Sequence, residues 1–358
     1  MNLTDDTSMN ITDEQSDERI LMAHGGGGEL MQRLIREHLV PPLASLANPL
    51  CNKAAELTDS AVVPWNAAEV VFTTDSFVVT PLEFPGGDIG RLAVCGTVND
   101  IAVMGAAPVA LSLALVLGEG LPVELLSRIM LSITRAADEA GVAIVTGDTK
   151  VIERHAGQPP ALIINTAGIG RLLCAAPPDA NRIRAGDRVI VNGFIADHGL
   201  AVMSAREGLK FETPLRSDAA PLNHLIARLA DSGIDVRFMR DATRGGVAGV
   251  LADVCDATGL SVVIEESQTP VSQPARMAAE MLGLDPLTVA NEGKVVIVIS
   301  ESDVMKALEL LRTDPLGRNA ACMGTITADR PALVELVTRT GGRRVMQRPY
   351  GESTPRIC

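Results

Sequence analysis

Residues 73–108 read TTDSFVVTPLEFPGGDIGRLAVCGTVNDIAVMGAAP, and they place a strand and a long helix next to each other. Apolar residues predict a short buried strand at Val70–Thr74, and apolar residues at helical spacing predict a helix at Gly90–Met104. A strand followed by a helix, repeated along a chain, is typical of the α/β class. Asp75 and Asp100 interrupt these apolar elements, so the same stretch also carries candidate chemistry.

The same alternation continues on both sides of this stretch. A helix is predicted at Val123–Ala140 because this segment starts behind Pro122 and stops at Gly141. The Pro-rich and Gly-rich residues between 177 and 187 mark a junction. We further expect strands at 143–146, 161–168, 188–193, 294–300 and 318–328, the first of them short and buried, and helices at 29–39, 221–232, 246–258 and 303–312.

The length of the chain, 358 residues, predicts about two domains, because one ordinary hydrophobic core does not extend over so many residues. The hydrophobic share of 47% provides enough apolar side chains for both cores. We therefore divide the chain into a disordered extension at 1–22, a glycine-rich loop and helix at 23–44, α/β domains at 45–172 and 180–335, and a flexible tail at 341–358.

Composition and charge exclude several classes of protein. The net charge of −13 repels a phosphate backbone, so we expect no nucleic-acid binding. No apolar run reaches the roughly 18–20 residues that span a membrane. The acidic N-terminal residues are unlike a secretory signal, which predicts a cytoplasmic protein. Six cysteines without C-x-x-C spacing predict neither a zinc site nor a redox pair, and Cys95 and Cys255 are expected to be small core residues.

A run of glycines precedes the first predicted helix. Glycines let a backbone approach a phosphate closely, and the N-terminus of the following helix offers free N–H groups. A flexible linker would have the same composition, so both interpretations stay open at this point. The residues concerned are His24, Gly25, Gly26, Gly27 and Gly28.

Three aspartates stand near predicted strand ends or inside an apolar helix. Asp75 follows the strand at Val70–Thr74, Asp100 lies in the predicted helix, and Asp148 follows the strand that ends at Thr146. Carboxylate oxygens are the ligands that Mg²⁺ prefers, so the three acids indicate a site for Mg²⁺ and phosphate. Lys150 would then face a phosphate or a reacting group. Each aspartate taken alone is also typical of a turn or a helix end.

The second half of the chain carries two further polar motifs. Residues 240–246, RDATRGG, combine cations with the start of a helix, which is equally typical of a capped helix. Residues 291–294, NEGK, introduce a predicted strand, and Glu292 beside a lysine could form a proton-handling pair or lie on the surface. The motif DHG at 197–199 could be only a loop.

The combination of motifs resembles a known family. The stretch at 73–108, followed in order by GDTKV, DHG, RDATRGG, NEGK and the final PRIC, is similar to the HypE hydrogenase-maturation family of the aminoimidazole ribonucleotide synthetase-like superfamily. The similarity runs from about His24 to Cys358. It implies a two-domain fold of the α/β (α+β) class, a homodimer whose N-terminal sheets form a shared barrel, and a mobile C-terminal tail.

The resemblance also implies a reaction. HypF would place a carbamoyl group on Cys358, and this protein would dehydrate the S-carboxamide to an S-thiocyanate with ATP and Mg²⁺. The cyano group would pass to iron held by the HypC–HypD complex and become a ligand of NiFe hydrogenase. An amide oxygen is a poor leaving group near neutral pH, so its phosphorylation by ATP makes chemical sense.

The family motifs assign roles to residues of this chain. Glu292 and Lys150 are the candidates for the base and for positioning, and Cys358 carries the reacting group. The tail from Tyr350 to Cys358, fully extended, reaches about 26–29 Å. The implied metal ligands are Asp75, Asp100 and Asp148, and the implied nucleotide-binding residues are His24, Gly25, Gly26, Gly27, Gly28, Asn99, Asp241, Thr243 and Arg244.

Two alternatives accompany this interpretation. Selenophosphate synthetases and thiamine-monophosphate kinases share the superfamily, but neither explains the final PRIC, and no cysteine precedes Cys51 near the glycine run. The other alternative is a binding protein that presents Cys358 to partners without turning over ATP.

Overall fold

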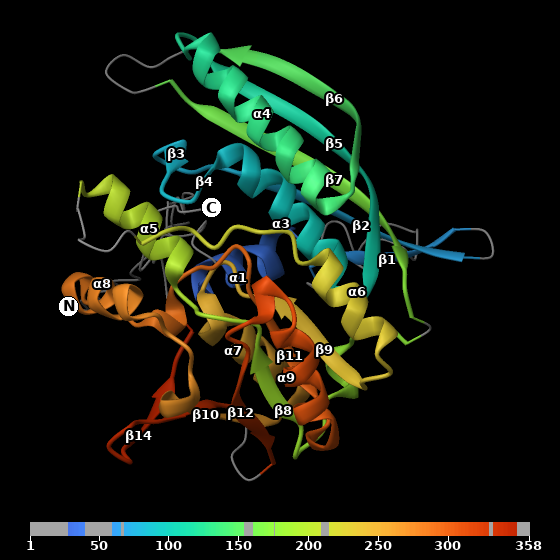
Figure 1. Ribbon diagram of the computed structural model, residues 1–358, viewed down its shortest axis with the longest axis vertical. Helices are drawn as coiled ribbons and strands as arrows, with labels where there is room; N and C mark the ends of the chain where they lie inside the picture. The colour runs from blue at the N-terminus through green and yellow to red at the C-terminus, as the bar shows by residue number, and fades with distance from the viewer. Residues whose placement is uncertain are drawn as a thin grey trace, which may run out of the picture.

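The computed structural model describes residues 28–39, 59–65, 68–153, 160–174, 176–208, 215–328 and 332–348. These residues form two large mixed sheets covered by helices, which confirms the α/β class (Figure 1). A small two-stranded sheet, β3 (Glu83–Phe84) with β4 (Gly87–Asp88), precedes the long helix of the first sheet. In the described part of the chain, no helix is both long and apolar enough to cross a membrane.

The first sheet has the strand order β1-β2-β7-β5-β6 and is antiparallel except for the β5–β6 pair. Two helices, α3 (Ile89–Val103) and α4 (Val123–Ala140), lie on one of its faces (Figure 1). Helix α4 begins after Pro122 and ends at Gly141, which adopts the left-handed conformation with φ of 66°, as predicted. The strands are β1 (Ala61–Trp65), β2 (Ala68–Phe77), β5 (Ala106–Gly118), β6 (Ala143–Ile152) and β7 (Leu162–Leu172).

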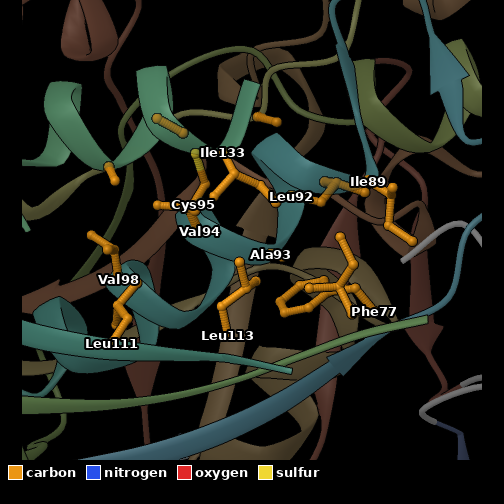
Figure 2. Packing of buried hydrophobic residues seen from close by; sticks show 14 of the residues in the cluster. Phe77, Ile89, Leu92, Ala93, Val94, Cys95, Val98, Leu111, Leu113 and Ile133 are labelled. Atoms are coloured by element: carbon orange, nitrogen blue, oxygen red, sulfur yellow. The ribbon is translucent and has the colours of Figure 1, made fainter. Parts of the chain in front are cut away.

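The core of this half lies between the sheet and its two helices, and glycine lets α3 approach the sheet closely. A Cβ atom at Gly96 would lie 2.8 Å from the ring of Phe77, so no larger residue fits there without a shift of the ring. Cys95, on the same helix, is fully buried as expected. Figure 2 shows this packing, with Phe77, Ile89, Leu92, Ala93, Val94, Cys95, Val98, Leu111, Leu113 and Ile133 labelled.

The second sheet has the order β14-β13-β10-β12-β8-β11-β9 and is covered on both faces. This explains why all five residues of β11 are apolar and buried. Val296 and Val298 pack in one cluster with α7, while Ile297 and Ile299 pack in another with α6 and α9. The strands are β8 (Arg188–Val191), β9 (Val236–Asp241), β10 (Ser261–Glu265), β11 (Val295–Ile299), β12 (Ala321–Thr327), β13 (Val334–Val337) and β14 (Arg343–Met346).

Helix α3 joins the two halves, because it contacts β2 and β7 of the first sheet and also α6 and β9 of the second half. A loop at residues 215–222, here called the clasp loop, strengthens this junction. Its Ser217 N–H donates to Pro85 O at 2.7 Å, and Arg91 of α3 donates to its Ala219 O at 2.7 Å. The helices of the second half are α5 (Asp197–Arg206), α6 (Asn223–Asp231), α7 (Gly246–Thr258), α8 (Gln273–Leu282) and α9 (Val304–Arg312).

Two local expectations were wrong, and one open alternative is decided. Strand β6 continues to Ile152 and is largely exposed, so the segment at 143–146 is neither short nor buried. Asp197 begins helix α5, so the alternative of a loop at the DHG motif does not hold. The tail predicted from residue 341 instead begins with strand β14, which pairs antiparallel with β13 and buries Met346. The sequence RRVM alternates too weakly to signal a strand, and pairing with an existing sheet edge stabilises it.

Candidate functional site

A cavity of about 290 Å³ lies at the junction of the two halves. Strand β2 and helix α3 form one wall, and the end of β9 with helix α7 forms the wall opposite. The first helix of the described chain, α1 (Glu29–Leu34), and the π-helical turn Ile35–Leu39 that continues it complete the rim. The lining residues are Met31, Gln32, Ile35, Asp59, Thr74, Asp75, Ser76, Phe77, Gly96, Asp100, Arg240, Asp241, Thr243, Arg244, Gly249, Val250, Asp253, Glu292 and Arg348.

Acidic side chains from both halves meet in this cavity. Asp75 and Asp100 come from β2 and α3, and Asp241 comes from the last position of β9. Thr73 donates to Asp100 Oδ2 at 3.0 Å. Burial raises the pKa of Asp100 and of Asp241 well above the ordinary value, and the charges of the neighbouring aspartates raise both further. Two of the three predicted metal ligands, Asp75 and Asp100, are therefore brought together with Asp241, which the resemblance assigned to nucleotide binding.

Glu292 also lines the cavity. It is only 2% exposed, and its Oε1 has no hydrogen-bond partner among the described residues. Burial raises the pKa of Glu292 well above its ordinary value, followed by the charges of Asp241, Asp218 and Asp75. A raised pKa makes a carboxylate a stronger proton acceptor than an exposed one, which suits general acid–base chemistry.

The clasp loop holds the loop that carries Glu292 in place. The Glu292 N–H donates to Asp218 Oδ1 at 3.1 Å, and Lys294 forms a buried ion pair with Asp218 at 2.9 Å. A Cβ atom at Gly293 would lie 2.1 Å from the carbonyl oxygen of Asp218, so the loop approaches as closely as only glycine allows. The lysine of the NEGK motif therefore pairs with Asp218, so neither open interpretation of Glu292 holds: it does not pair with this lysine, and it is not on the surface.

Cations line the side of the cavity that belongs to the second half. Arg240 lies between two aspartates, 2.9 Å from Asp59 and 2.8 Å from Asp253. These carboxylates raise the pKa of Arg240, so its positive charge is secure at any physiological pH. Arg244 also lines the cavity, beside Thr243 at the start of α7. Guanidinium groups next to a helix N-terminus suit the binding of phosphate groups.

Asn99 was predicted to lie near a nucleotide, but its side chain forms hydrogen bonds to backbone groups of two loops. It is 2% exposed and does not line the cavity. Its Nδ2 donates to Ala220 O at 3.1 Å and to Glu292 O at 3.2 Å, and its Oδ1 accepts from the Leu222 N–H at 2.7 Å. The amide therefore connects α3 to the clasp loop and to the loop of Glu292.

Only the last residue of the glycine run lies within the described part of the chain. Gly28 is buried and precedes α1, and the Gln32 N–H donates to its carbonyl oxygen at 3.1 Å. Met31, Gln32 and Ile35 line the cavity, so the helix predicted to follow the glycines lies where a nucleotide would be bound. The predictions for His24, Gly25, Gly26, Gly27 and Cys358 fall outside the described residues.

Asp148 and Lys150 do not reach the cavity of their own chain. Both lie inside β6, where they form an exposed ion pair at 2.9 Å, and neither follows the end of a strand as predicted. The strand register places Asp148 beside Ala114, then Asn165, then Ser76 of the cavity wall. Asp148 is thus on the same open face of the sheet as Ser76 but three strands away, about 14 Å at the usual strand spacing.

The donor set of the cavity fits a magnesium ion. Asp75, Asp100 and Asp241 offer carboxylate oxygens, and a divalent cation would offset the repulsion that raises the pKa of Asp100 and Asp241. In the residues that the structure describes, no three His, Cys, Asp or Glu side chains are already gathered around one point. Mg²⁺ is usually held by one or two carboxylates together with phosphate oxygens and water.

The sequence did not predict several residues of the cavity. Arg240 stands in the quoted RDATRGG motif, and this motif was the available signal. Asp59, Asp253 and Arg348 belong to no recognisable motif, and only the fold brings them to one place. Asp253 lies on the face of α7 that looks into the cavity, which periodicity alone does not distinguish from a solvated face.

Two sheets joined by α3, with an acidic cavity at their junction, are the features of a known class of protein. Family models of AIR synthase related protein match this chain, the N-terminal domain at residues 57–172 and the C-terminal domain at residues 184–335. The two-domain α/β fold is therefore that of the AIR synthase related proteins.

Comparisons over the full length of the chain identify the family within this class. The carbamoyl dehydratase HypE of Rhodobacter capsulatus is 43% identical over 342 residues, which cover 96% of this chain and 99% of the relative. A solved HypE–HypF complex contains a chain with a TM-score of 0.80 and 42% identity, covering 90% of this chain and 100% of that one. A solved HypE in complex with ATP has a TM-score of 0.78 and 39% identity, covering 95% and 100%. The chain belongs to the HypE carbamoyl dehydratase family of hydrogenase-maturation proteins.

Proposed function

We propose that this protein dehydrates the S-carboxamide of its own Cys358 to an S-thiocyanate, with ATP and Mg²⁺, and so supplies cyanide for the Fe(CN)2CO centre of NiFe hydrogenase. The observation that carries the proposal is the cavity itself, in which buried Glu292 shares one space with Asp75, Asp100 and Asp241 and with arginines. The solved relative that contains ATP supports the choice of nucleotide.

The reaction requires the residues in this cavity to support phosphoryl transfer, to remove protons and to neutralise negative charge. The carbamoyl oxygen on Cys358 attacks the terminal phosphoryl group of ATP, ADP leaves, and the amide nitrogen gives up one proton. The second N–H proton then leaves as the C–O bond breaks, so that phosphate departs and a C≡N bond remains. Mg²⁺, when bound, would neutralise charge on the transferred phosphoryl group. Arg240 and Arg244 would orient the phosphates, and Asp75, Asp100 and Asp241 would hold the ion.

Glu292 is the base that the geometry favours. Glu292 lines the cavity, its Oε1 has no partner among the described residues, and burial raises its pKa, so that it holds a proton more readily than an exposed carboxylate does. The bonds from Asn99 and Asp218 to its backbone fix its position before the substrate arrives. Asn99 therefore takes part as a positioning residue, and Thr243 and the glycine run would contact the nucleotide.

Lys150 and Asp148 have a place in this proposal only within a homodimer. The open face of the first sheet carries exposed apolar side chains, including Phe72 at 46% and Ile169 at 43%. Such a face is typical of an interface. We propose that two copies join through these faces as a shared barrel, which brings Asp148 and Lys150 toward the cavity of the partner subunit.

The proposed partners follow from the family. HypF would donate the carbamoyl group, and the HypC–HypD complex would accept the cyano group. The solved HypE–HypF complex of a relative supports the first of these. A cytoplasmic location stays a prediction.

The decisive experiment is mass spectrometry of the C-terminal peptide after incubation with HypF, carbamoyl phosphate and Mg·ATP. A carbamoyl adduct on Cys358 that loses one water in the wild type, and not in a Glu292→Gln variant, is the expected result. If the adduct forms and persists in the wild type, the protein presents Cys358 without acting on it. An unmodified Cys358 with an active HypF control would return the question to small-molecule ATP enzymes of the same class.

A further inference from the structure

The DHG motif, at the start of helix α5, lies outside the cavity but borders the loop that carries Glu292. The Gly199 N–H donates to Ala290 O at 3.0 Å, and the Ala196 N–H donates to Asn291 Oδ1 at 2.7 Å. Ala290 and Asn291 immediately precede Glu292 in the chain. The start of α5 is therefore hydrogen-bonded to the loop that presents the candidate base.

His198, the middle residue of this motif, is fully buried. Its Nδ1 lies 2.8 Å from Ser217 Oγ of the clasp loop, and its ring meets the ring of Phe84 edge-on, with the centroids 5.5 Å apart. The imidazole thus lies between strand β3 of the first half and the clasp loop. A hydrogen bond made by a fully buried nitrogen is costly to break, so this bond restrains the clasp loop.

The hydroxyl group of Ser217 passes this restraint to the next residue, Asp218. Ser217 Oγ also accepts from the Ala219 N–H at 3.1 Å, so the hydroxyl closes a turn around Asp218. The Asp218 Oδ1 accepts in turn from the Glu292 N–H at 3.1 Å. The chain of hydrogen bonds that begins at His198 therefore ends on the backbone of Glu292.

Asp218 is held as a carboxylate. It forms the buried ion pair with Lys294, and both side chains are no more than 10% exposed. Burial acts to raise the pKa of Asp218, but the charge of Lys294, followed by that of His198, lowers it below its ordinary value. An ionised acceptor makes a stronger hydrogen bond than a neutral one, so Asp218 holds the Glu292 N–H firmly.

We propose that His198 is a positioning residue for the dehydration, which acts through the clasp loop on Glu292. Its bond to Ser217 holds Asp218 where that carboxylate accepts from the Glu292 N–H. This inference rests on the proposed function, because it assumes that Glu292 is the base. Misplacing a catalytic group by about 1 Å can lower a rate by about 10²-fold, so a bond outside the cavity can control the reaction within it.

The first test is the first-order rate of dehydration in the full-length protein at saturating Mg·ATP, measured on the C-terminal peptide by mass spectrometry after carbamoylation by HypF. His198→Phe keeps a ring against Phe84 and removes the bond to Ser217, so we expect the rate to fall by about 10–100-fold. The KM for ATP should not change, because neither residue of the lost bond lines the cavity. His198→Asn, whose amide group can take the place of Nδ1, should restore part of the rate.

A matched control lies on the same helix. Ser204 is buried, and its Oγ donates to Leu200 O at 2.6 Å, away from the clasp loop. Ser204→Ala removes a buried hydrogen bond of α5 and should keep the wild-type rate. A comparable fall of the rate in Ser204→Ala would mean that any damage to α5 slows the reaction, and it would overturn the specific role of His198.

A double-mutant cycle separates positioning from a general defect. If His198 acts through Glu292, then His198→Phe should cause no further loss of rate in a Glu292→Gln background, because the base is already absent. A further loss of the same size in that background would show that His198 acts elsewhere, and the proposal would be wrong.

Hydrogen exchange gives a readout that needs neither ATP nor HypF. In the nucleotide-free protein, His198→Phe should speed exchange of the Glu292 amide several-fold, and Ser204→Ala should not. Should His198→Phe fail to fold, Ser217→Ala removes the same bond from its other end, and the same changes in exchange and rate are expected.

The failure of this inference can be told apart from the failure of the proposed function. Wild-type rate and wild-type exchange in His198→Phe overturn the positioning role and leave the proposed function standing. If the wild type never dehydrates its carbamoyl adduct, or if Glu292→Gln dehydrates it as fast as the wild type, the proposed function is contradicted and the role of His198 is overturned with it.

Discussion

Replacing Glu292 with glutamine should make the protein more stable and nearly inactive. The wild-type Oε1 is buried without a partner among the described residues, and an unmet buried acceptor costs about 1–3 kcal/mol. Glutamine keeps the shape, cannot ionise, and offers N–H donors to the surrounding carboxylates. We therefore expect the free energy of unfolding to rise by about 1–3 kcal/mol and the dehydration rate to fall by about 10²–10⁴-fold.

The difference in the free energy of unfolding between Glu292→Gln and the wild type should increase as the pH rises. Burial and neighbouring acids raise the pKa of Glu292 in the folded protein above the ordinary value of 4.5. A group of this kind contributes its full stability below the unfolded pKa and loses it as pH rises through the folded pKa. The gain from Glu292→Gln is therefore smallest in acid and grows toward alkaline pH. Thermal unfolding of the metal-free and nucleotide-free protein, followed across this pH range, measures it.

A matched control is Glu83→Gln. Glu83 is about half exposed and forms an ion pair with Arg128 at 2.9 Å, which lowers the pKa of Glu83. Its replacement should leave activity unchanged and lower stability by no more than about 1 kcal/mol, with the loss confined to pH above its pKa. The reasoning about Glu292 fails if Glu292→Gln is no more stable than the wild type at alkaline pH, or if the difference does not change with pH.

Three further changes test other parts of the structure. Ile169→Asp, on the open sheet face, should convert a dimer to a monomer in light scattering, whereas Leu131→Asp, exposed on α4, should not; a monomeric wild type would refute the shared barrel. Gly293→Ala should lower stability by at least about 1–3 kcal/mol in denaturant unfolding, because its Cβ would lie 2.1 Å from a carbonyl oxygen; a neutral effect would mean that the loop yields freely. Mg²⁺ alone should raise the melting temperature more at alkaline than at acid pH, because it binds the ionised carboxylates, and Asp100→Asn should weaken this effect; an increase independent of pH would place the ion elsewhere.

Much of the fold could be predicted because its elements carry local signals. Helix α4 has a proline before it and a glycine after it, and its observed bounds are the predicted ones. Strand β6 was misjudged because polar residues from Thr146 to Lys150 interrupt its apolar residues and because an edge strand is not buried. Strand β14 depends on the edge that β13 offers, which is a long-range contact that no window of sequence contains.

The residues of the site likewise differ in how much of their role the sequence predicts. Asp75, Asp100, Asp241 and Glu292 stand in short motifs, and the fold brings them to one cavity. Asn99 stands in such a motif too, yet its hydrogen bonds depend on the clasp loop, more than a hundred residues further along the chain. A motif identifies a residue that matters, but only the packing decides whether it faces a ligand or holds a loop in place.

The three bonds of Asn99 also limit how the enzyme can move. A hinge between the two halves would break all of them together and leave buried polar groups unmet, at about 1–3 kcal/mol for each group. We therefore expect the two halves to act as one rigid body during turnover. Under the proposed function, ATP would then enter and ADP would leave the cavity, whose lining includes residues of α1 and Arg348, without a hinge motion of the two halves.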